Sequence, residues 1–319
     1  MAKQRWRGQK GPTLDPDSQV AYLESRGVTF ERVDRQAAAR YLRDVGGYMR
    51  TASYKSLYPK TPGDGGVTRY IGLDFSELID LTEIDHRLRM TFLPIALDVE
   101  QAAKLELLYC ADRHREDSYA VVSDYFSSLS GGRRARLEAE LEDRRGDSDV
   151  YEGELIDKYV GDMPLWVIAE VLDFGDFLEL WAFCANRWHD DGLKETRYLL
   201  KDVKELRNAC AHGSAVLNGI SSGASKYATP QPLQEALSGS HIGTRDERDR
   251  WTRNPRTLEM LAALWGIRDI VRSDDRHEAA KAGVDALLAR ARLHADWYTD
   301  VEPLCSCYRF FSQTARAWL

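Results

Sequence analysis

The stretch VKELRNACAHGSAVLNG, residues 203–219, places Arg207, Asn208 and His212 close together among small residues. Histidine, with a reference pKa of about 6.5, can transfer protons at neutral pH. The planar guanidinium group of arginine can pair with two phosphate oxygens. On a helix, Asn208 and His212 lie one turn apart, whereas Arg207 lies about 140° from His212 and must reach the same opening with its long side chain. These residue types favour a site that binds or cleaves a phosphodiester.

Cleavage of RNA makes three demands that these side chains could meet. A 2′-hydroxyl must lose a proton, the leaving 5′-oxygen must gain one, and the phosphorane must be stabilised. His212 would act as base or acid, Arg207 would bind the phosphate, and Asn208 would hold the imidazole in one tautomer or bind the phosphate. No metal ion is needed. One histidine is half of an acid–base pair, so a symmetric dimer would have to supply the second.

The composition restricts the class of protein. A formal net charge of −7 argues against a protein that coats nucleic acid by bulk attraction, although it leaves room for a local cationic groove. The five cysteines are scattered without a CxxC pair, which favours reduced thiols in a cytoplasmic protein. We expect no signal peptide and no membrane-spanning segment. The basic N-terminal arm, residues 1–17, is either a disordered start or a tail that contacts phosphate.

Other common sites are not predicted. The sequence contains no GxxxxGK[ST] loop, no GxGxxG after a strand and no HExxH. Cys305 and Cys307, with His294 upstream, are weak evidence for zinc. We therefore expect no metal and no cofactor. The motif also has a purely structural interpretation, in which Arg207 and His212 are ordinary residues of a helical scaffold.

The hydrophobic pattern predicts an all-α protein. Leu78, Leu81, Ile84, Leu88 and Phe92 recur at spacings of three and four and form one apolar stripe. Helices are expected over 17–30, 34–49, 75–110, 163–189, 193–212, 254–272 and 275–298, with a kink or split at Pro94, a break at Gly175 and a long Gly/Ser loop over 219–255.

Four ordered segments give the chain a resemblance to a known family. They are YLESRGVTF…AARYLRDVGGYMRTASYKSLY, FSELIDLTEIDHRLRMTFLPIALDVEQAAKLEL, MPLWVIAEVLDFGDFLELW and LRNACAHGSAVLN. Together they resemble the bacterial abortive-infection (Abi) family of the AbiD and AbiF type, which belongs to the wider HEPN superfamily. The resemblance spans roughly residues 20–218 and is far more specific than one RxxxxH match.

The resemblance implies an all-α HEPN bundle and an endoribonuclease used in phage defence or as a toxin. Its active site would be shared across a homodimer, with Arg207, Asn208 and His212 as catalytic residues, and with Asn218 and Arg50 binding RNA or supporting the site. The expected partners are RNA and an RNA or protein antitoxin. The expected organisation is an N-terminal arm and hairpin over 1–72, a HEPN-like core over 73–218, the loop over 219–255, and helices over 256–319 that pack on the core.

The chain also departs from the family pattern. Ala215 stands where the family usually has an arginine, and Leu217 replaces an aromatic residue. The missing arginine removes one expected phosphate contact. This departure and the net negative charge of the chain keep a second interpretation open. In it, the site around Arg207 and His212 binds RNA or a nucleotide without cleaving it. A helix-turn-helix DNA reader over 17–49 is a further alternative, but its basic residues are balanced by acids.

Overall fold

The computed structural model describes residues 15–63, 68–220 and 228–319, and within these ranges it confirms the all-α prediction. The basic arm falls largely on residues 1–14, outside the described residues. One two-stranded antiparallel sheet is present in the described chain, in which Thr61 of β1 (Lys60–Pro62) lies opposite Arg69 of β2 (Thr68–Tyr70). Every other regular element of the described ranges is helical.

The helices follow the chain in three groups. The N-terminal group is α1 (Pro16–Ser25), α2 (Arg35–Tyr41), a π-helical turn (Leu42–Gly46), α3 (Tyr48–Thr51) and a 3₁₀ segment (Ala52–Leu57). The middle group is α4 (Phe75–Arg113), α5 (Ser118–Ser128), α6 (Gly131–Asp143), a 3₁₀ turn (Gly146–Ser148), α7 (Gly153–Tyr159), α8 (Leu165–Val171), α9 (Phe174–Arg187) and α10 (Asp191–Ala211). The C-terminal group is α11 (Gln231–Gly239), α12 (Arg245–Thr252), α13 (Pro255–Asp269), α14 (Asp274–Arg292), a 3₁₀ turn (Ala295–Tyr298) and α15 (Glu302–Trp318).

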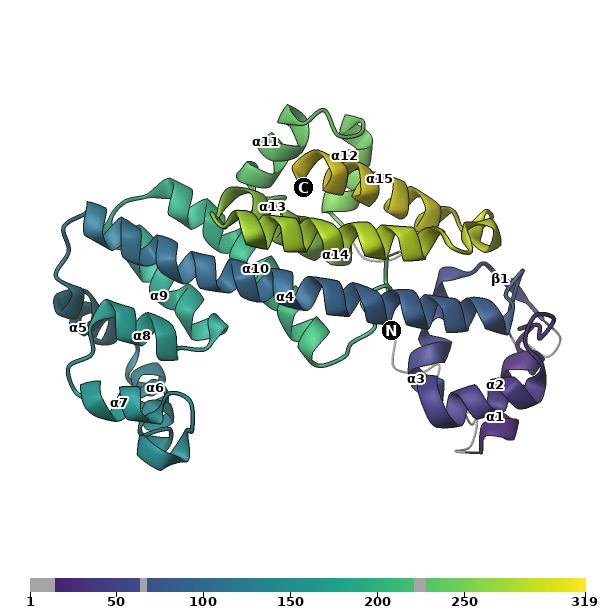
Figure 1. Ribbon diagram of the computed structural model, residues 1–319, viewed down its shortest axis with the longest axis horizontal. Helices are drawn as coiled ribbons and strands as arrows, with labels where there is room; N and C mark the ends of the chain where they lie inside the picture. Colours follow the sequence, from purple (N-terminus) through teal and green to yellow (C-terminus); the bar gives the residue numbers. More distant parts are fainter. Residues whose placement is uncertain (1–14, 64–67, 221–227) are drawn as a thin grey trace.

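Helix α4 is the axis of the molecule. It runs from the N-terminal group at one end to α5–α8 at the other, with α10, α13 and α14 packed along it (Figure 1). The predicted apolar stripe is its buried face, including Leu78, Leu88 and Phe92. Helix α13 approaches so closely that a Cβ added at Gly266 would lie 2.7 Å from a methyl carbon of Val99. Helices α13 and α14 therefore pack against α4.

The split that was one of two expectations at Pro94 does not occur, and the break expected at Gly175 is shifted. Pro94 does not split α4, which is continuous over 39 residues; its neighbours Phe92, Ile95 and Ala96 are buried, and this packing holds the helix together across the proline. The break expected at Gly175 falls instead at Asp173, which caps α9 by accepting a hydrogen bond from the backbone N–H of Asp176.

The prediction of a long loop over 219–255 is wrong for most of the residues described there, because α11 and α12 lie within this range. Leu233, Ala236 and Leu237 of α11 are buried. Helix α12 begins with a capping box between Thr244 and Glu247, a signal present in the sequence. Residues 221–227 of the expected loop lie outside the described residues.

The packing of α10 on α13 includes an acidic group that makes stability depend on pH. Burial raises the pKa of Asp202 to about 7, with Glu259 and Glu205 raising it further and Lys201 opposing them. Between about pH 4 and 7 the folded protein keeps a proton that the unfolded chain has released, so the free energy of unfolding should fall as pH rises, by at most about 1.4 kcal/mol per pH unit. Asp202→Asn should flatten this slope in urea unfolding at pH 5 to 8.

Glu278, an exposed residue of α14, provides the control for this measurement. Glu278→Gln should leave the slope almost as it is in the wild type, because Glu278 is not among the charged groups that act on Asp202. Equal slopes for the wild type and Asp202→Asn would show that Asp202 does not carry the proton.

Candidate functional site

Helix α10 presents the 203–219 stretch at its C-terminal end. The helix starts at Asp190, whose side chain accepts from the backbone N–H of Leu193, and ends with His212 as its C-cap. Gly213 follows with φ +67°, and the N–H groups of Gly213 and Ser214 bond to the carbonyls of Cys210 and Ala209. This is a Schellman motif, which requires a left-handed residue that glycine adopts easily. The local sequence therefore fixes where the helix stops and leaves His212 at its tip.

Arg207 and Asn208 contact each other directly. An Nη of Arg207 donates to Oδ1 of Asn208 at 3.0 Å. On its other side, Nε of Arg207 lies 3.5 Å from Oε2 of Glu100 on α4. The side chain of Arg207 is 34% exposed, whereas that of Glu100 is 12% exposed. Burial raises the pKa of Glu100, and the positive charge of Arg207 opposes this shift. Arg207 is thus held against the core at Nε while part of its guanidinium faces solvent.

His212 is exposed, and its side chain forms no hydrogen bond or ion pair with any of the described residues. The imidazole is therefore free to meet a ligand. The structure places the three candidate residues in the last two turns of α10 and at its C-cap, with Arg207 and Asn208 in direct contact. A single chain offers one imidazole here.

Arg50 and Asn218 lie beside this helix end although they are distant in sequence. An Nη of Arg50, on α3, donates to the carbonyl oxygen of Gly213 at 2.8 Å. Oδ1 of Asn218 accepts from the hydroxyl of Ser56 at 2.8 Å. Both residues thus tie the chain around the motif to the N-terminal helices. In this geometry Arg50 stabilises the backbone that follows His212, and its other donors remain exposed to solvent.

A buried ion pair behind the motif was missed by the sequence reasoning. Asp85 and Arg89, one turn apart on α4, are paired with side chains 0% and 5% exposed. Arg89 donates to the carbonyl of Ser214 at 3.2 Å, and Asp85 accepts from the N–H of Leu217 at 2.7 Å. Burial raises the pKa of Asp85, and the Leu217 N–H and Arg89 oppose the shift. The pair anchors residues 214–217; its signal in the sequence was two opposite charges at i and i+4 beside an apolar stripe.

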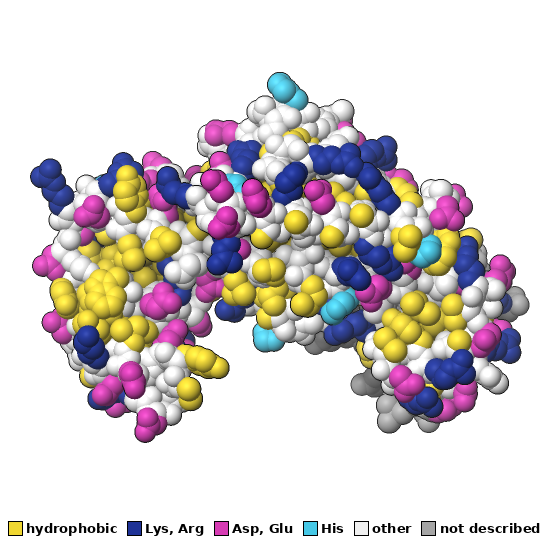
Figure 2. Space-filling view, viewed as in Figure 1, with side chains coloured by type: hydrophobic (Ala, Val, Ile, Leu, Met, Phe, Trp, Pro, Cys, Tyr) yellow, Lys and Arg dark blue, Asp and Glu magenta, His cyan; other side chains and the backbone are white. Residues whose placement is uncertain are grey.

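The end of α10 lies in an indentation of the molecular outline. In the ribbon view its last turn hangs below α4, between the N-terminal helices and α5–α8 (Figure 1). The space-filling view shows the same lower edge hollowed between the two ends of the molecule (Figure 2). The last turn of α10 therefore borders this hollow.

The described residues give no support to the weak zinc signal. His294 stacks on Trp297, Cys305 donates to the carbonyl of Tyr298, and Cys307 contacts the hydroxyl of Thr257. A carboxylate group that is compact enough for a metal ion occurs elsewhere, at Glu140, Asp173 and Asp176. Arg133 and Arg136 already pair with Asp176, so this group is explained as an ion-pair network.

The protein-family model described as Abi-like protein matches residues 40–218, more than half of the chain. The chain belongs to the Abi-like protein family. The match begins before Arg50, includes α4 and ends at Asn218, so it contains every candidate site residue. Membership suggests a role in abortive-infection defence.

Neither the curated proteins nor the solved structures give a significant match to the chain. Among the helices described, none has the length and apolar character needed to cross a bilayer.

Proposed function

We propose that this Abi-like protein is a metal-independent endoribonuclease of the HEPN type that acts in abortive infection. The observation that carries the proposal is the grouping of Arg207, Asn208 and His212 at one solvent-facing helix end, with the first two in direct contact. A guanidinium, an amide and an unpartnered imidazole supply the groups that phosphodiester cleavage needs.

The reaction would use two copies of the chain. The imidazole of one copy removes the proton from the 2′-hydroxyl, and O2′ attacks the adjacent phosphorus. The P–O5′ bond breaks, and the imidazolium of the other copy protonates the leaving O5′. Arg207 binds the non-bridging oxygens, on which negative charge increases. The products are a 2′,3′-cyclic phosphate and a 5′-hydroxyl. The reaction is a transesterification, so it needs no oxidant or reductant.

The first experiment incubates the purified protein with total cellular RNA in excess EDTA and identifies the ends of the fragments. We expect cleavage to continue in EDTA and to leave 2′,3′-cyclic phosphate and 5′-hydroxyl ends. Light scattering on the same sample should give the mass of a dimer. Fragments with 5′-phosphate ends, or cleavage that stops in EDTA, would contradict the proposed chemistry.

An alternative is a binding module that holds RNA or a nucleotide intact. The ion pair between Arg207 and Glu100 favours it, because this contact withdraws part of the guanidinium from a phosphate. Ala215, in place of the expected arginine, removes another phosphate ligand. RNA recovered uncut from a tight complex with the wild-type protein would support this alternative. An RNA or protein antitoxin remains a proposed partner of either form.

Releasing Arg207 from Glu100 should strengthen RNA binding. Glu100→Gln removes the buried negative charge, so the guanidinium can give all its donors to phosphate. We expect the Kd for a short RNA to fall a few-fold, on the order of 1 kcal/mol. Glu205→Gln is the control, since it removes one negative charge from an exposed position on α10. Equal gains in both variants would mean that net charge, and not the release of Arg207, sets the affinity.

A further inference from the structure

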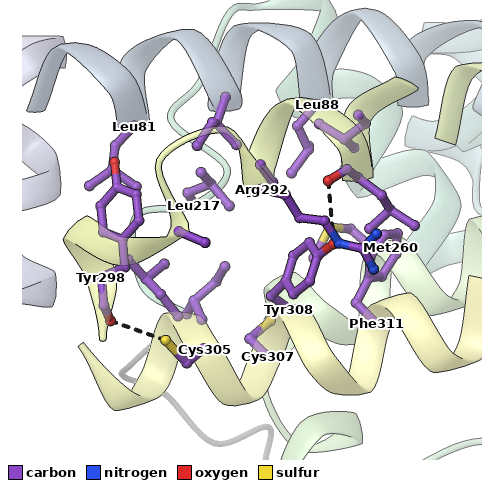
Figure 3. Close-up of a pocket in the computed structure, with 17 residues that line it drawn as sticks. Leu81, Leu88, Leu217, Met260, Arg292, Tyr298, Cys305, Cys307, Tyr308 and Phe311 are labelled. Carbon is purple, nitrogen blue, oxygen red and sulfur yellow. Dashed lines mark hydrogen bonds between the residues drawn. The ribbon is translucent and has the colours of Figure 1, made fainter. Parts of the chain in front are cut away.

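An apolar cavity lies between the helices on the side of α4 that faces α13, α14 and α15. Its volume is about 140 Å³, and Leu217 and Ile220 are among the residues that line it. Leu217 is labelled in the close-up of the cavity (Figure 3). Its lining is almost wholly apolar, with Leu81, Leu88, Met260 and Phe311 contributed by three different helices. An apolar cavity of ~150 Å³ in another protein stays dry and binds benzene. The volume here is therefore sufficient for a small aromatic ring or a short branched alkyl chain.

The polar atoms around the cavity are already satisfied by the protein. The hydroxyl of Tyr308 donates to the carbonyl of Leu288 at 3.3 Å, and the thiol of Cys305 donates to the carbonyl of Tyr298 at 3.0 Å (Figure 3). The hydroxyl of Tyr298 donates to Asp80 at 2.6 Å. A water molecule in the cavity would find few partners, whereas an apolar group would lose nothing by entering.

Arg292 adds a charge to this apolar lining. Among the described residues around the cavity it is the one ionised side chain, and it forms no ion pair within the described chain. Its guanidinium carbon lies 5.8 Å from the centre of the Tyr308 ring, which forms part of the cavity wall. A cation held beside an apolar cavity fits a ligand with an apolar body and a carboxylate group.

The cavity also touches the backbone that follows the motif. The side chain of Leu217 lines it, and the N–H of the same residue bonds to buried Asp85. Ile84 and Leu88, which directly precede Asp85 and Arg89, line it too. An occupant of the cavity would therefore pack against the residues that anchor the segment after His212.

We propose that this cavity is a binding site for a small apolar carboxylate, whose apolar body fills the cavity and whose carboxylate pairs with Arg292. The bound group packs against Leu217 and Ile220, which line the cavity, and so stabilises the segment over 214–220. This binding does not rest on the proposed ribonuclease function.

The test uses 3-phenylpropionate and its neutral analogue 3-phenyl-1-propanol with the full-length protein, measured by calorimetry. We expect both to bind the wild type. Arg292→Gln should weaken 3-phenylpropionate about tenfold and leave the alcohol unchanged. Ala291→Leu, which extends a larger side chain into the cavity, should abolish binding of both, whereas Ala289→Leu, at an exposed position of the same helix, should not. Urea unfolding of each variant verifies that it is folded.

A second readout follows amide hydrogen exchange over residues 214–220. Saturating 3-phenylpropionate should slow exchange of these amides about tenfold or more in the wild type and in Ala289→Leu, but not in Ala291→Leu. The inference is overturned if neither compound binds the wild type, if Ala291→Leu binds them equally well, or if exchange over 214–220 is unaffected. None of these measurements uses RNA, so their failure is distinguishable from failure of the proposed ribonuclease.

Discussion

His212→Asn is expected to lower the rate of RNA cleavage by about 10²- to 10⁴-fold, the contribution typical of a group that transfers a proton in the transition state. Asparagine keeps a polar side chain at the C-cap but cannot take up or release a proton near neutral pH. The imidazole has no partner among the described residues, so its loss should leave the free energy of unfolding almost unchanged. Single-turnover cleavage of a defined RNA and urea unfolding measure the two quantities.

Two further variants separate catalysis from general damage. His241→Asn makes the same exchange at another exposed histidine, on the turn after α11, and should cleave like the wild type. Arg207→Lys keeps the charge that faces Glu100 but loses the planar fork, so it should fold normally and lose activity. Cleavage at the wild-type rate by His212→Asn would remove the imidazole from the mechanism and leave the binding alternative.

Much of the fold was readable from short-range patterns. The apolar stripe of α4 and the position of the motif at the end of α10 both depend on residues within a few turns of one another. The four segments that resemble the Abi family lie mostly inside the residues matched by the family model. Local periodicity and motif order therefore sufficed for the class and the family.

Features that depend on distant contacts were not predictable in this way. Glu100 and Arg207 form an ion pair although they are far apart in the sequence. No local pattern around Glu100 indicates that it contacts a residue of α10. The hydrogen bond from Leu217 to Asp85 joins residues 132 apart. The missed helices α11 and α12 had local signals, but their Gly, Ser and Pro content suggested a loop more strongly than the capping box suggested a helix. Packing, which buries Leu233 and Leu237, decides in favour of the helix.

Arg89→Met should lower the free energy of unfolding by about 3–5 kcal/mol, because it leaves the carboxylate of Asp85 buried without its ion-pair partner. The carbonyl of Ser214 loses a donor at the same time. Adding Asp85→Asn should recover part of this loss, since the amide is neutral yet still accepts from the N–H of Leu217. Urea unfolding at pH 7 measures both variants.

The exposed pair of Glu83 and Arg87 supplies a control with the same i, i+4 spacing on the same helix. Its side chains are 46% and 57% exposed, so Arg87→Met should cost no more than about 1 kcal/mol. A similar loss at both positions would show that burial does not set the value of the Asp85–Arg89 pair. A large loss at Arg89 alone, together with faster amide exchange over 214–217, would mean that the stability of α4 and the placement of the motif depend on the same two side chains. Any substitution there would then change activity without touching RNA.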